Sequence, residues 1–85
     1  MDLSQYVKTM KRLPERFVGR IPEPDLEGLR SMARGGEWDE LLDLLVAALG
    51  GTQAPVTAAE RDELAVLLNE AGMPTVRLDE LNVTG

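Results

Sequence analysis

The segment GEWDELLDLLVAALGG, residues 36–51, shows the clearest helical pattern in the sequence. Its apolar side chains recur every three or four residues, a spacing that places them along one face of an α-helix. These side chains are Trp38, Leu41, Leu42, Leu45 and Leu49. We therefore expect a helix from about Glu37 to Leu49 that is ended by the glycine pair at residues 50–51.

Helical spacing also occurs toward the N-terminus. A first helix is predicted with Asp2 as its N-cap. It is expected to end near Arg12, because Pro14 follows and a residue that precedes proline avoids the helical region. Its apolar residues are Leu3, Tyr6, Val7, Met10 and Leu13. A second helix is expected to start at Pro24 and to end at the glycine pair 35–36.

The C-terminal part predicts one further helix. Residues 57–60, Thr-Ala-Ala-Glu, fit a capping box, and Gly72 is a typical helix stop. The apolar face between them consists of Leu64, Leu67, Leu68 and Ala71. Residues 78–81 are expected to form a last turn, and residues 82–85 a frayed end. The pattern predicts an all-α fold, a small bundle of about four helices with short loops, in one domain spanning residues 1–85.

The composition argues against catalysis. The 85 residues include no cysteine and no histidine, so thiolate ligands and the commonest general acid or base are both missing. The acidic residues show neither a calcium loop nor a Glu-x-x-His motif, so we expect no metal, no cofactor and no enzymatic activity. The N-terminus does not resemble a signal peptide, and the most apolar stretch, residues 41–49, is too short to span a bilayer. The expected location is cytoplasmic, without a membrane partner.

The charge distribution points to a protein partner. The net charge of −6 argues against nucleic acid as a ligand, because binding to phosphates requires a basic surface. Residues 1–34 hold seven basic and five acidic residues, whereas residues 35–85 hold two basic and ten acidic residues. The asymmetry predicts attraction to a positively charged protein, and a small-molecule substrate is not expected. A need for solubility, which a small domain meets with net charge, explains the negative charge equally well.

The candidate partner-binding residues lie mainly on the predicted helix 37–49. Asp39 and Asp43 are like charges four residues apart, and no lysine or arginine lies between residues 35 and 60 to relieve them. Either this is a binding patch or it is a solvated helix face. Trp38 is either an anchor at the rim of the core or an interface hot spot. The set that we expect to bind a partner is Glu37, Trp38, Asp39, Glu40, Asp43 and Glu63.

Several short motifs resemble a known family. Gly36-Glu37 leads into the leucine-rich helix, Ala54-Pro55-Val56-Thr57 with Glu60 opens the next helix, and Ala71-Gly72-Met73 closes it. This arrangement, over about residues 29–73, resembles the MafI-like small helical immunity proteins of bacterial polymorphic-toxin and contact-dependent growth inhibition systems. The resemblance implies a protein that neutralises a cognate secreted toxin by covering its active site, with a basic C-terminal toxin domain as partner.

Two other readings fit the same residues. The first is an acidic helical adaptor or regulatory protein that binds a basic protein outside any toxin system. The second is self-association through apolar positions outside the main stripes, namely Val46, Val66 and Val76.

Overall fold

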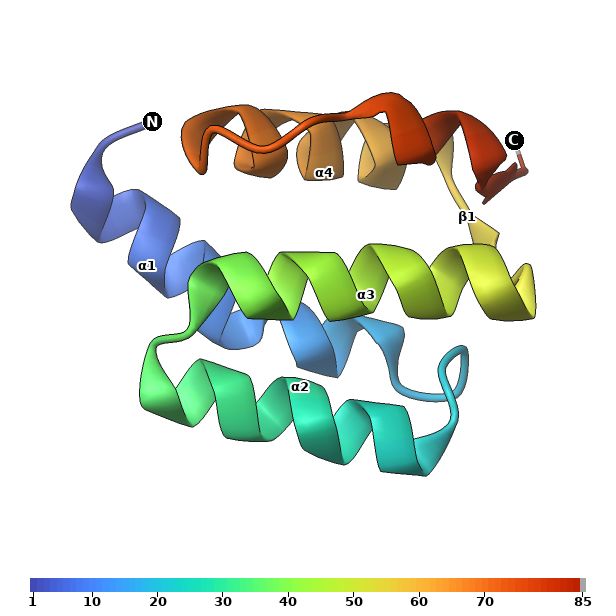
Figure 1. Cartoon of the computed structure of the whole chain (residues 1–85), viewed down its shortest axis with the longest axis horizontal. Helices are drawn as coiled ribbons and strands as arrows, with labels where there is room; N and C mark the ends of the chain where they lie inside the picture. Colours follow the sequence, from blue (N-terminus) through green and yellow to red (C-terminus); the bar gives the residue numbers. More distant parts are fainter. Residues whose placement is uncertain (85) are drawn as a thin grey trace.

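The computed structural model describes residues 1–84, and these residues form the expected small all-α bundle. The α-helices in that span are α1 (Leu3–Arg12), α2 (Glu23–Gly35), α3 (Trp38–Thr52) and α4 (Ala58–Glu70). Two 3₁₀ helices, η1 (Leu13–Phe17) and η2 (Val76–Glu80), and two short strands, β1 (Pro55–Val56) and β2 (Asn82–Val83), complete the described elements. Helix α3 lies between α2 and α4 (Figure 1).

The core is centred on α3. Leu41, Leu42, Leu45 and Leu49 are fully buried, and Val46 is only 2% exposed. Full burial of one such side chain stabilises the fold by roughly 1.5–3 kcal/mol relative to exposure, so this helix supplies a large part of the apolar stabilisation. The expectation that Val46 lies outside the main stripe is wrong. Because α3 has neighbours on both sides, its buried surface is wider than a single stripe.

The C-terminus of α3 differs from the expectation. The helix continues through Gly50 and Gly51 and ends only at Thr52, followed by Gln53 in a left-handed conformation with φ 54°. Two side chains bond to carbonyls of the last turns: the hydroxyl of Thr52 donates to the carbonyl of Ala48 at 2.7 Å, and Nε2 of Gln53 donates to the carbonyl of Gly50 at 2.8 Å. The bond from Gln53 satisfies one of the orphan carbonyls of the helix end, that of Gly50, and the helix stops at the left-handed Gln53 rather than at the glycine pair.

The other helix ends largely follow the sequence signals. Gly36 adopts φ 69° after α2, and the following amide, of Glu37, donates to the carbonyl of Met32 at 2.9 Å. At the start of α4 the hydroxyl of Thr57 accepts from the amide of Glu60 at 3.0 Å, and the carboxylate of Glu60 accepts from the amide of Thr57 at 2.9 Å. The predicted capping box is therefore confirmed. Gly72, with φ 70°, follows α4 as expected.

A short parallel sheet joins the C-terminal segment to the bundle. Pro55 pairs with Asn82 and Val56 pairs with Val83, and the amide of Thr84 donates to the carbonyl of Val56 at 2.8 Å. Residues 82–84 are thus not frayed, as the sequence suggested, while Gly85 lies outside the described residues. Strands of two residues leave no periodic pattern in a sequence, which explains why this pairing was not predicted.

Arg20 connects the loop after η1 with the start of α4. Its guanidinium donates to both carboxylate oxygens of Glu60, at 2.8 and 2.7 Å, and also to the carbonyls of Pro55 and Arg16. The same guanidinium lies 4.7 Å from the ring centre of Phe17, a cation–π contact. The hydrogen bonds from Arg20 lower the pKa of Glu60 to about 2, although partial burial of the carboxylate opposes the shift.

This ion pair makes stability depend on pH. A carboxylate whose pKa is lowered in the folded state stabilises the protein above its unfolded pKa, here 4.5, and loses that contribution as the pH falls toward 2. We expect Glu60→Gln, which keeps a side chain able to complete the capping box, to cost about 2 kcal/mol of unfolding free energy at pH 6.

The difference between wild type and this variant should shrink as the pH is lowered to about 3, as measured by urea unfolding at both pH values. Glu80→Gln is the control, since Glu80 is exposed and forms no ion pair within residues 1–84. An equal loss of unfolding free energy in Glu60→Gln at both pH values would contradict the lowered pKa of Glu60 in the folded protein.

Candidate functional site

Three of the predicted binding residues form an exposed acidic surface at the start of α3. Glu37 precedes the helix, and Asp39 and Glu40 stand in its first turn. All three are exposed, and within residues 1–84 none of them has a lysine or arginine within ion-pair distance. We call these residues the acidic face. Asp39 and Glu40 also favour the helix by lying near the positive end of its dipole, so their position has a structural benefit of its own.

The other two predicted carboxylates are paired. Asp43 contacts Arg77 of η2 at 2.6 Å, and Glu63 of α4 pairs with Arg16 of η1. This partner of Asp43 could not be found from local spacing, because Arg77 lies 34 residues further along the chain. The expectation that Asp43 lacks a basic neighbour is wrong. These pairs are exposed and contribute little stability, but they reduce the negative charge that Asp43 and Glu63 can offer a partner.

Trp38 and Asp39 border a notch at one end of the bundle. Figure 1 shows the start of α1, the start of α3 and the end of α4 meeting at this end. The notch has a volume of about 330 Å³ and is lined by Met1, Asp2, Leu3, Tyr6, Trp38, Asp39, Glu70 and Ala71. We call it the acidic notch, because three of its lining side chains are carboxylates. It adjoins the acidic face through Asp39.

The hydroxyl of Tyr6 is the unusual group in the acidic notch. Tyr6 is only 8% exposed, and its hydroxyl is buried without a hydrogen-bond partner among residues 1–84. Buried polar groups are nearly always paired in folded proteins, so an unpaired one points to a functional role or a missing partner. Burial raises the pKa of Tyr6, and the nearby carboxylates of Asp39 and Glu70 raise it further. The hydroxyl therefore stays protonated at neutral pH.

Apolar side chains flank the carboxylates of the acidic notch. Leu3 is 77% exposed and Trp38 is half-buried against the core. The α-amino group of Met1 lies 3.3 Å from Oε1 of Glu70, so an ammonium group already contacts this carboxylate. Glu70 is therefore paired within the protein, whereas Asp39 has no ion-pair partner within residues 1–84.

Sequence reasoning found Trp38 and Asp39 but missed the rest of the notch. Asp2 and Tyr6 lie near the start of the chain and Glu70 lies at the end of α4, so no spacing in the sequence connects them. Tyr6 was assigned to the apolar face of the first helix, which is correct for its ring. Only the structure shows that its hydroxyl is buried without a hydrogen-bond partner among residues 1–84.

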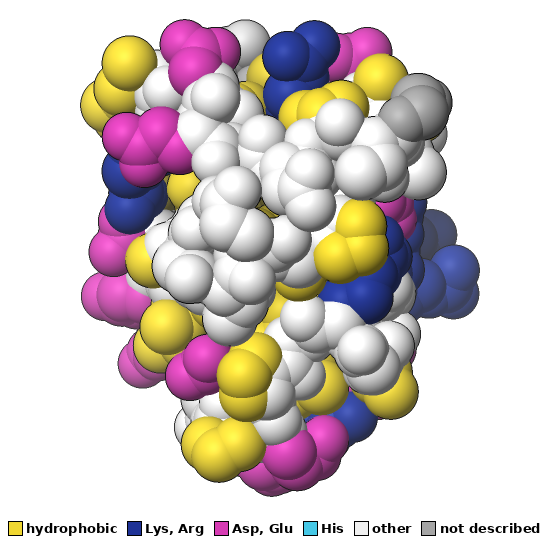
Figure 2. Space-filling model, turned by 90° about the vertical axis from the view of Figure 1, so that its right-hand side faces the viewer, with side chains coloured by type: hydrophobic (Ala, Val, Ile, Leu, Met, Phe, Trp, Pro, Cys, Tyr) yellow, Lys and Arg dark blue, Asp and Glu magenta, His cyan; other side chains and the backbone are white. Residues whose placement is uncertain are grey.

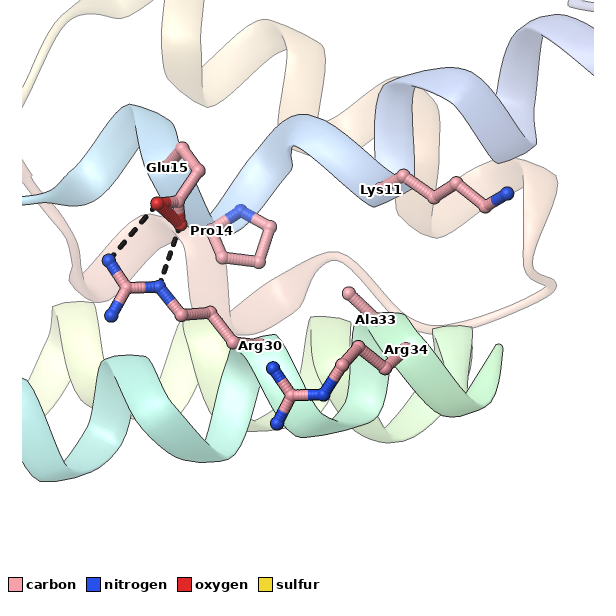
Figure 3. Close-up of a pocket in the computed structure, with 6 residues that line it drawn as sticks. All are labelled: Lys11, Pro14, Glu15, Arg30, Ala33 and Arg34. Atoms are coloured by element: carbon pink, nitrogen blue, oxygen red, sulfur yellow. Dashed lines mark hydrogen bonds and ion pairs between the residues drawn. The ribbon is translucent and has the colours of Figure 1, made fainter.

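A second hollow, of about 500 Å³, lies between η1 and α2 and has the opposite charge (Figure 3). Arg30 donates to Glu15 at 2.8 and 3.0 Å, as drawn in Figure 3, and also bonds to Glu23 and Glu27. These bonds raise the pKa of Arg30, and the bond from Arg30 lowers the pKa of Glu15. The cluster joins α2 to η1, so its arrangement has a structural explanation.

The far end of α3 is poor in charge. Residues 44–59 and 81–84 contain no charged side chain, and they meet where β1 pairs with β2. Figure 2 shows this end of the molecule, with both acidic and basic side chains at its margins and mainly uncharged side chains and backbone at its centre. The excess of acidic residues in the C-terminal part is therefore not spread evenly, and the opposite end of α3 carries the acidic face.

Comparisons with known proteins identify no relative: no family model, no curated protein and no solved structure matches the chain. Within residues 1–84 no cluster of three or more potential ligand side chains could hold a metal ion, and no helix is long and apolar enough to cross a membrane. The acidic face and the acidic notch are therefore the features from which a function can be inferred.

Removing the hydroxyl of Tyr6 should not destabilise the protein. Because the hydroxyl is buried without a partner, Tyr6→Phe keeps the packing of the ring and removes a desolvation penalty. We expect the unfolding free energy to be unchanged or to rise by up to about 1 kcal/mol, measured by chemical denaturation. A loss of more than about 1 kcal/mol would mean that the hydroxyl forms a hydrogen bond in the folded protein.

Proposed function

We propose that the protein is a stoichiometric inhibitor that binds a basic protein, in the manner of an immunity protein that neutralises a cognate secreted toxin. The observation that carries the proposal is the acidic face: Glu37, Asp39 and Glu40 are exposed and lack ion-pair partners within residues 1–84. Of the three, Asp39 also lines the acidic notch. The resemblance of residues 29–73 to small helical immunity proteins supports the same function.

Inhibition of this kind requires no chemistry from the inhibitor. The acidic face attracts the basic partner through long-range electrostatic forces, and this attraction raises the association rate. Trp38, half-buried at the edge of the acidic notch, is placed to serve as an anchor within a charged rim, the arrangement typical of interface hot spots. The bound protein then blocks the entrance to the partner's active site. Asp43 and Glu63, which are paired within the protein, contribute less to this attraction than the acidic face does.

The first test is to capture the partner. The chain serves as bait in lysate of its native organism, the bound protein is identified, and its dissociation constant is measured at two salt concentrations. The proposal expects one basic protein, bound at nanomolar strength or tighter, whose own activity is lost in an equimolar complex. A basic partner whose activity is unaffected would favour the acidic adaptor instead, and capture of no specific protein would contradict the proposal.

Charge reversal tests which surface binds. The double variant Asp39→Lys/Glu40→Lys should reduce the association rate at low salt by about tenfold or more, because it replaces attraction by repulsion at the site of contact. The loss should diminish as salt is added, since exposed charges are screened.

A matched control is the double variant Asp79→Lys/Glu80→Lys, which changes the net charge equally. These residues are exposed in η2, and the backbone of Glu80 bonds to Gln53 beyond the opposite end of α3. Equal losses in the two double variants would show that only net charge matters and would contradict a localised binding face.

A further inference from the structure

We propose that a second copy of this chain docks along the exposed side of α1, with the two copies of α1 antiparallel and related by a two-fold axis. The acidic surface at the start of each α1 then meets the basic surface at the end of the other. This inference goes beyond the proposed function and does not depend on it. It is carried by the separation of opposite charges toward the two ends of one exposed helix.

The basic side chains without an ion-pair partner gather on and beside the second half of α1. Five of the nine lysines and arginines form ion pairs with carboxylates of the protein, in which 15 acidic residues outnumber 9 basic ones. The other four are exposed and have no carboxylate within ion-pair distance among residues 1–84. We call these four the basic face: Lys8, Lys11, Arg12 and Arg34.

Two hollows show that the basic face surrounds the end of α1. Lys11 and Arg34 line the hollow between η1 and α2, where Figure 3 shows them without the ion pair that Arg30 forms. Lys8 and Arg12 line another hollow, of about 240 Å³, between α1, η1 and α4. Cations near the end of a helix also gain from its dipole. The dipole does not explain why these four lack a carboxylate partner in an acidic protein.

Carboxylates surround the opposite end of α1. Asp2 caps the helix, and Asp39 lines the acidic notch beside it. From Asp39 the acidic face continues along the start of α3, and its three carboxylates have no ion-pair partner within residues 1–84. Surfaces of opposite charge therefore stand at the two ends of α1, which has 10 residues and is about 15 Å long.

A surface with one acidic end and one basic end is complementary to a copy of itself. In a two-fold contact the same surface serves both partners, so the second copy must be turned around to bring opposite charges together. Antiparallel α1 helices place each basic face against the acidic face of the other copy. Parallel α1 helices would place like charges against each other and be repelled.

The side of α1 that faces solvent leaves room for this contact. Only Tyr6 and Met10 of its 10 residues are buried. Leu3, at 77%, is the most exposed of the large hydrophobic side chains in residues 1–84. A second copy would cover Leu3 and so add apolar burial to ion pairs that contribute little on their own. The net charge of −6 on each copy opposes association, so we expect a weak dimer with a dissociation constant of about 0.1–1 mM.

The first test is the oligomeric state of the purified chain. Sedimentation equilibrium at low salt, from about 20 μM to about 2 mM protein, should show a monomer–dimer equilibrium. A monomer over the whole range would overturn the inference. Assemblies that grow beyond a dimer would also overturn it, because a two-fold contact closes after two copies.

Charge reversal tests which surfaces meet. The double variants Asp39→Lys/Glu40→Lys and Lys11→Glu/Arg12→Glu should each raise the dissociation constant of the dimer about tenfold or more, because each places like charges in both contacts. An equimolar mixture of the two variants should restore dimerisation to within about threefold of wild type, since opposite charges meet again in both contacts. This rescue also shows that both variants are folded.

The matched control is Asp79→Lys/Glu80→Lys, which changes the net charge as much as reversal of the acidic face does but leaves both faces intact. It should dimerise at least as well as wild type and should not rescue Lys11→Glu/Arg12→Glu. Equal rescue by this control would show that net charge governs association and would overturn the inference. Failure of the mixed reversal variants to form a dimer would overturn it as well.

Discussion

Burial of α3 between α2 and α4 is the interaction on which the rest of the structure depends (Figure 1). Four leucines of this helix are completely shielded from water, and all fully buried hydrophobic side chains of the described residues belong to one continuous core. A chain of 85 residues can bury only a limited surface on folding, so the fold depends strongly on this one core. The 3₁₀ helices and the two short strands pack around this framework.

The same burial places the candidate site. Because α3 is fixed through its apolar face, its first turn must lie where α1 begins and α4 ends, and its carboxylates must point to solvent. The acidic face and the acidic notch are thus consequences of one packing arrangement. The far end of α3 is fixed by the same packing but carries no charge over residues 44–59, so the two ends of one helix present surfaces of different character.

The helices could be predicted because their signals are local. The apolar spacing of α3 and the capping box before α4 each lie within one stretch of sequence, and the structure confirms both. Interactions between distant segments could not be predicted. The pairing of β1 with β2, the contact of Arg77 with Asp43 and the composition of the notch each require the folded chain. Val46 was misjudged for the same reason, since its burial depends on which helices flank α3.

We expect the protein to bind its partner at the end of the bundle where α3 begins. Hydrogen exchange of the backbone amides, compared between the free protein and its complex with the captured partner, tests this location. We predict added protection at the start of α1, the first turn of α3 and the last turn of α4, with little change around β1 and β2. Protection concentrated around β1 and β2, with none at the start of α3, would contradict it.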